Sequence, residues 1–249
     1  ANGNNDTFVS WNWEAASSTA SNTDGDLTSS VRANQSAGFS IVKFTAGGSY
    51  GMRSIGHGLN AKPSIVISKR IDSAGDWLVH TDVTGSILQL ELNKTDAGVA
   101  ASSYYSANSS TFSLYHGHYM DNGWEFINYC FTPVAGFSAF GSYIGNGSSS
   151  NGAFIPLSFR PRWVLIKATS ISGQSWYILD AARDPHNLTA NKLEANSSNA
   201  ENASPNTATT NSLDLLSNGF KLRTSNDGTN QNNATYIYAA FAENPFQAN

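Results

Sequence analysis

The chain has 249 residues, of which 40% are hydrophobic and only 13% charged, and its formal net charge is -4. Its 14 lysine and arginine residues are scattered, which argues against a nucleic-acid partner because phosphate recognition needs clustered basic side chains. No apolar run approaches the length of a membrane span, so the sequence predicts no membrane insertion.

The first 37 residues predict two short segments ahead of the main fold. Residues 7–13 share the apolar character of 125–131 and 235–241, each of which we expect to close a module. Residues 1–15 are therefore interpreted as the closing strand of an upstream module, or as an arm that docks elsewhere in an assembly. Residues 16–37 are rich in Ser, Thr, Asn and Asp and predict a polar linker.

The rest of the chain contains one pattern twice. Gly38-Phe39-Ser40 recurs as Gly136-Phe137-Ser138, and Pro63 with Lys69 recurs at the same spacing as Pro161 with Lys167. An internal repeat of this length predicts two modules, 38–135 and 136–249, here called module 1 and module 2. The join at 132–135 is short, so we expect the two modules to hold a fixed relative orientation.

Short bursts of apolar residues, separated by Gly, Asn, Ser and Asp, predict strands and tight turns throughout both modules. In module 1 the predicted strands are 41–45, 64–69, 77–81, 87–92, 112–115 and 125–131. In module 2 they are 141–145, 163–167, 176–180, 220–223 and 235–241, with a polar surface loop at 196–211. The predicted fold class is all-β, with two tandem β-sandwich modules of jelly-roll or lectin-like type after the extended strand and linker.

Three segments of module 2 carry a family resemblance: 142–147 (Ser-Tyr-Ile-Gly-Asn-Gly), 159–167 (Phe-Arg-Pro-Arg-Trp-Val-Leu-Ile-Lys) and 216–222 (Leu-Ser-Asn-Gly-Phe-Lys-Leu). With the ending 236–246 they resemble tandem β-sandwich modules of tail-fibre and other virion structural proteins of tailed bacteriophages, of the marine type. The resemblance covers 38–246 and is weaker in module 1. It implies no catalytic residues.

The resemblance implies a virion structural protein on a tail appendage or the capsid surface, extracellular after release. The first hypothesis is an adhesin, that is, a tail-fibre receptor-binding component for host attachment. Its expected partners are copies of itself, with a trimer favoured, other virion proteins, and a host surface glycan or protein. The alternative is a capsid-decorating or fibre-shaft protein that binds no receptor. A glycan depolymerase is a third hypothesis, disfavoured because no sandwich-fold glycanase motif is present, and the protein is predicted not to be an enzyme.

Candidate contact residues are sought where the two modules differ. Residues 115–124 of module 1 replace a polar loop of module 2 and concentrate aromatic side chains beside polar ones, an arrangement suited to sugars and to protein interfaces. The predicted receptor or glycan contacts are Tyr104, Tyr105, Tyr115, Tyr119 and Trp124.

The same loop contains a His-x-His pair, His116 and His118. In an extended chain both imidazoles face one way, so they are candidate ligands of a metal ion on a trimer axis, where three pairs would complete the coordination shell. No other cofactor is expected. The alternative interpretation is a hydrogen-bonded aromatic loop tip.

Overall fold

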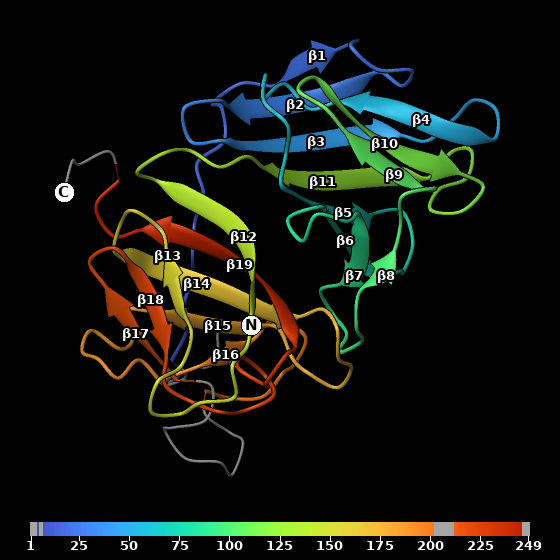
Figure 1. Cartoon of the computed structure of the whole chain (residues 1–249). Helices are drawn as coiled ribbons and strands as arrows, with labels where there is room; N and C mark the ends of the chain where they lie inside the picture. Colours follow the sequence, from blue (N-terminus) through green and yellow to red (C-terminus); the bar gives the residue numbers. More distant parts are fainter. Residues whose placement is uncertain (1–3, 5–6, 202–211, 246–249) are drawn as a thin grey trace.

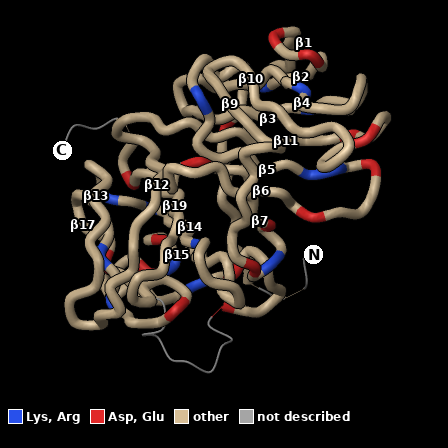
Figure 2. Tube along the Cα trace, turned by 45° about the vertical axis from the view of Figure 1, so that its right-hand side comes forward, with Lys and Arg blue, Asp and Glu red and all other residues tan. Residues whose placement is uncertain are grey.

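The structure is a computed structural model that describes residues 4, 7–201 and 212–245. The described residues form strands and no helix, so the predicted all-β class is confirmed. Within them, no helix is long and apolar enough to cross a membrane. Acidic and basic residues are scattered along the chain of both modules in Figure 2.

Module 1 is a two-layer sandwich, which occupies the upper part of Figure 1. Its large sheet has the order β1-β2-β3-β11-β5-β6-β7-β8, in which β1 and β2 come from residues ahead of position 38 and extend the module, and its small sheet has the order β4-β10-β9. The strands are β1 Ala20–Asn22, β2 Ser29–Asn34, β3 Phe39–Thr45, β4 Gly51–Gly56, β5 Ile65–Arg70, β6 Trp77–Thr81, β7 Leu88–Glu91, β8 Val99–Ala100, β9 Tyr105–Ala107, β10 Thr111–His116 and β11 Glu125–Phe131.

Module 2 repeats this topology in the lower part of Figure 1. Its large sheet, β12-β19-β14-β15-β16, matches β3-β11-β5-β6-β7, and its small sheet, β13-β18-β17, matches β4-β10-β9. The strands are β12 Ser138–Ile144, β13 Phe154–Pro156, β14 Pro161–Ala168, β15 Tyr177–Asp180, β16 Leu193–Glu194, β17 Leu213–Leu216, β18 Gly219–Leu222 and β19 Thr235–Ala242. The shared strand order accounts for the sequence repeat.

All the strands predicted within the two modules are present, but the predicted linker is wrong. Within 16–37, β2 pairs with β3 from Ser29↔Phe44 to Asn34↔Phe39, and β1 pairs with β2. These strands were missed because β2 offers only one large apolar side chain, Val31, to the core. Backbone pairing with β3 holds a strand that hydrophobic pattern alone does not predict.

Each module has its own core between its two sheets. In module 1 the core includes Val42, Phe44 and Phe112, and in module 2 it includes Val164, Leu179 and Phe220. The single cysteine, Cys130, is buried in the core of module 1, and burial raises the pKa of its thiol to about 12. Part of the predicted loop 196–211, residues 202–211, lies outside the described residues.

A third apolar cluster joins the two large sheets. Strand β14 presents Val164 and Ile166 to its own core and Trp163 and Leu165 toward module 1, so it is apolar on both faces. A strand covered on both sides is expected to show such a continuous apolar run. Polar contacts complete the junction: the Trp176 indole N–H donates to the Glu91 carbonyl at 2.9 Å, and the Gly98 amide donates to the Thr169 carbonyl at 2.8 Å.

The arm, residues 7–16, forms no strand in the structure. The expected closing strand is therefore not formed, and the arm instead lies against both modules of its own chain. Trp13 packs edge-on against Phe131 (6.2 Å between ring centroids) and Phe241 (5.3 Å), which lie 6.1 Å apart. These three residues occupy the same position in the segments 7–13, 125–131 and 235–241. Residues 1–3 and 5–6 of the predicted arm lie outside the described residues.

Candidate functional site

The predicted histidine pair does not lie on one extended strand. Strand β10 ends at His116, and Gly117 then adopts a φ of 93° and donates its amide to the Met120 carbonyl at 2.8 Å, which turns the chain. His116 is 2% exposed and its ring lies 5.0 Å from that of Tyr50, whereas His118 is exposed and stacks on Tyr104 at 4.0 Å. The geometric premise of the predicted metal site is therefore wrong.

No other group replaces that pair as a metal site within the described chain. Among those residues, no three or more His, Cys, Asp or Glu side chains are placed to hold a metal ion together. A site shared between subunits through His116 and His118 stays a prediction.

The predicted aromatic contacts divide between core and surface. Tyr105 is 3% exposed and stacks on His80 at 4.4 Å inside module 1, so the prediction that it contacts a receptor is wrong. Strand β9 turns Tyr105 inward, while its neighbour Tyr104 stays half-buried. Tyr115 is also half-buried and meets Tyr104 edge-on at 5.5 Å.

The structure brings Tyr119 and Trp124 together with His118 at an open cleft of about 400 Å³ in module 1. This cleft, here called the polar cleft, lies between the loop 117–124 and one face of β5, β6 and β7. Four further lining side chains carry charge or an amide, namely Arg70, Asp76, Gln89 and Glu91. Sequence reasoning missed these four because they lie far from the loop along the chain.

A chain of hydrogen bonds orients the polar groups at one side of the polar cleft. The Tyr119 hydroxyl donates to Gln89 Oε1 at 2.6 Å, and Gln89 Nε2 donates to Glu91 Oε1 at 2.8 Å. The amide of Gln89 is thereby fixed between an aromatic hydroxyl and a carboxylate. The second carboxylate oxygen of Glu91 makes no hydrogen bond within the described chain, so the group still has acceptor capacity.

Asp76 supplies a second carboxylate. It accepts hydrogen bonds from Asn93 Nδ2 at 2.9 Å and Lys94 Nζ at 2.7 Å. These bonds, that of Asn93 first, lower the pKa of Asp76, so it is ionised at neutral pH. The polar cleft therefore offers two fixed carboxylates as hydrogen-bond acceptors.

Trp124 is covered on one face by Arg70. The guanidinium lies 3.8 Å from the ring centroid and forms two hydrogen bonds with Asp72, at 2.8 and 3.0 Å. The hydrogen bonds from Arg70 lower the pKa of Asp72 to about 2. The stacked guanidinium and indole, held together by a cation–π contact, thus border the polar cleft.

Several other carboxylates form ion pairs with basic side chains. Asp72 pairs with Arg70, Asp76 with Lys94, and Asp180 with Arg183. Asp180 also caps a turn, because its Oδ1 accepts the amides of Ala182 and Arg183 at 3.0 and 2.9 Å. Asp180 therefore stabilises the turn that follows β15.

The comparisons with known proteins give a family and no function. No curated protein and no solved structure matches the sequence. Residues 1–245 match a family described as a domain of unknown function, DUF7483, and this match includes the arm and both modules. The chain therefore belongs to the DUF7483 family.

Proposed function

We propose that the protein is a virion attachment component that binds a neutral, hydroxyl-rich saccharide of the host surface in the polar cleft. The observation that carries this proposal is the stacked Arg70–Trp124 pair, which lies beside the oriented Tyr119–Gln89–Glu91 hydrogen-bond chain. A concave site with an aromatic wall and a few converging polar groups is suited to a small polar ligand. The bacteriophage resemblance of module 2 supports the location on a tail appendage.

The charges of the polar cleft favour a neutral saccharide over an acidic one. Glu91 and Asp76 present carboxylates, which accept hydrogen bonds from sugar hydroxyls. Two of the basic groups nearby are paired, Arg70 with Asp72 and Lys94 with Asp76, and Lys69 donates to the Gly75 carbonyl at 2.9 Å. An acidic sugar would meet like charges here, and like charges brought together in a cleft weaken binding.

The proposal assigns binding rather than a reaction to this site. Removing acceptor groups should therefore lower affinity, and no product should form from the retained saccharide.

A glycan array of neutral and acidic bacterial oligosaccharides tests the site. We expect the wild type to retain neutral members, and Glu91→Ala to weaken their retention at least tenfold, since a charge-assisted hydrogen bond contributes about 1.5–3 kcal/mol. Phe154→Ala in module 2 is the control, because Phe154 is 44% exposed and distant in the fold from the polar cleft. Equal retention by wild type and Glu91→Ala would refute the site.

The virion assignment has a separate test. Antibodies raised against the protein should label the tail appendages of the particles that carry its gene. Labelling of the capsid alone would favour the decorating role, and absence of labelling would refute both.

A further inference from the structure

Module 2 leaves one edge of its large sheet open where module 1 covers the equivalent edge. In module 1, β3 pairs with β11 on one side and with β2 on the other. In module 2, β12 takes the place of β3 and pairs with β19, but no described strand pairs with its other side. Figure 1 shows β12 as the outermost strand of that sheet. This side of residues 138–144 is here called the free edge.

The hydrogen bonds at the two ends of β12 show which of its backbone groups lie on the free edge. The Phe137 carbonyl accepts the Ala242 amide at 2.8 Å, and the Gly145 amide donates to the Ala234 carbonyl at 2.9 Å. In an antiparallel pair, the residues that bond to the partner alternate along the strand. The odd-numbered residues of β12 therefore bond to β19, and the even-numbered ones point their N–H and C=O groups away from it.

Three even-numbered residues of β12 keep open backbone groups on the free edge. The Ser138 amide donates to the Val134 carbonyl at 2.9 Å, which leaves Phe140, Ser142 and Ile144. Among the described residues, no group bonds to the backbone of these three on this side. Open N–H and C=O groups along an edge strand are a template for a further strand.

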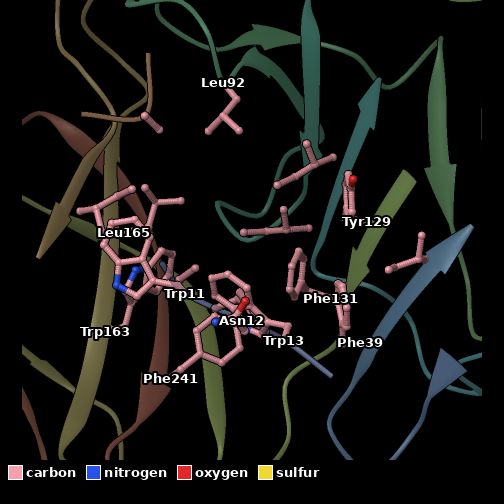
Figure 3. A pocket seen from close by; sticks show the side chains of 17 residues that line it. Trp11, Asn12, Trp13, Phe39, Leu92, Tyr129, Phe131, Trp163, Leu165 and Phe241 are labelled. Atoms are coloured by element: carbon pink, nitrogen blue, oxygen red, sulfur yellow. The ribbon is translucent and has the colours of Figure 1, made fainter. Parts of the chain in front are cut away.

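The free edge is open in its backbone and does not expose the core. Tyr143 packs against the module 2 core, and its hydroxyl donates to the Thr229 carbonyl at 2.7 Å. The other face of the sheet is covered at the junction, where Trp13 lies against Trp163 and Phe241 (Figure 3). The groups left open are those that an extended strand pairs with.

Among the strands at the ends of the two large sheets, a second β12 is the best match in length. The other end strands, β1, β8 and β16, have three, two and two residues, whereas β12 has seven. β12 also contains neither Lys nor Pro, the residues that commonly protect an exposed edge, and it carries no charge that would repel a second copy. We propose that two copies of the chain pair through their free edges, antiparallel about a twofold axis at Ser142.

This arrangement uses all the open backbone groups of the free edge. Ser142 of one copy faces Ser142 of the other, and Phe140 faces Ile144 on either side of the axis. The Ile144 side chain, which is 64% exposed in one chain, then lies beside Phe140 of the other copy, and apolar cross-strand pairs stabilise antiparallel sheets. A twofold axis closes the assembly at two copies, in contrast to the trimer that the family resemblance favours. The polar cleft takes no part, so neither proposal depends on the other.

Analytical ultracentrifugation of the full chain over a range of concentrations tests the assembly. We expect a dimer that dissociates on dilution. A trimer would overturn the proposal, and so would a monomer at every concentration, which would leave a strand of another protein as the occupant of the free edge.

A matched pair of variants tests the position of the axis. Ser142→Pro removes the amide donor on the free edge, where a proline breaks no bond to β19, so the dimer should weaken roughly tenfold or more. Ser142→Ala loses only the hydroxyl, which donates to the Val83 carbonyl at 3.0 Å, and should dimerise as the wild type does. A Ser142→Pro variant that dimerises like the wild type, or a monomeric Ser142→Ala, would refute the axis.

A second pair keeps the test valid if Ser142→Pro does not fold, which circular dichroism shows. Ile144→Lys brings a charge against Phe140 of the other copy and should abolish the dimer. Phe154→Lys is its control, because Phe154 is 44% exposed on β13 of the small sheet, and it should leave the dimer intact. Wild-type dimerisation of Ile144→Lys would contradict the proposed contact.

Amide hydrogen exchange locates the contact residue by residue. The amides of Phe140, Ser142 and Ile144 should exchange slowly at high concentration and fast on dilution, whereas those of their odd-numbered neighbours, which bond to β19, should not change. A dimer in which these three amides exchange equally fast at both concentrations uses another surface, and the proposal is then wrong.

Discussion

Replacing Lys167 by Met should change how stability depends on pH. Lys167 is fully buried, and its Nζ donates to the Gln174 carbonyl at 2.8 Å and across the junction to the Thr95 carbonyl at 3.2 Å. Burial lowers the pKa of its amine to about 8, against 10.5 ordinarily. Between these values the unfolded chain binds more protons than the folded one, so wild-type stability rises with pH across this window.

The linkage predicts the size of the effect. From pH 7.5 to 9.5 the amine should add about 2 kcal/mol to the wild-type free energy of unfolding, and Lys167→Met should lack this increment. Other titrating groups are common to both proteins and cancel in the difference.

Urea unfolding at pH 7.5, 8.5 and 9.5 measures the difference between the two proteins. The control is Lys43→Met, which removes an amine that is 50% exposed and pairs with Glu125, and its stability should run parallel to that of the wild type. If Lys167→Met also runs parallel to the wild type, the amine is not desolvated at the junction and the reasoning is wrong.

Two further substitutions and one labelling experiment test the buried groups. Asn230→Ala should lower the free energy of unfolding by roughly 3 kcal/mol, since its buried amide donates to Asn146, Ser148 and Thr224; urea unfolding at pH 7 checks this, and a loss below 1 kcal/mol would contradict it. His80→Phe should reduce the loss of stability between pH 6.5 and about 3, because burial lowers the pKa of His80 to about 3 and the unfolded chain alone takes up the proton there; acid titration followed by circular dichroism measures it, and unchanged acid sensitivity would count against it. The Cys130 thiol should resist a thiol-reactive dye until the protein unfolds, and rapid labelling of the native protein would show that module 1 opens readily.

Most strands could be predicted because local apolar patterns mark them. The predicted strands 77–81 and 125–131 match β6 and β11 residue for residue. Strand β2 could not be predicted, since its place depends on pairing with β3 rather than on its own composition.

The sites could be predicted only in part. The proximity of Tyr119 and Trp124 could be predicted because both belong to one aromatic loop, whereas Glu91 and Arg70 reach the polar cleft from strands far away along the chain. Sequence alone could not show that Tyr105 faces the core and Tyr104 does not. Which of the two side chains points inward depends on where β9 begins, and β9 begins at Tyr105. Contacts made by folding over long sequence distances leave no local pattern.

Trp13, Phe131 and Phe241, which hold the same place in three similar segments, meet at one joint between the arm and the two modules. A substitution at any one of these rings therefore removes contacts with both of the others, so the attachment of the arm and the packing of the two modules depend on one another. The loop 117–124 lies outside this cluster and can differ from its counterpart in module 2 without changing how the modules are joined.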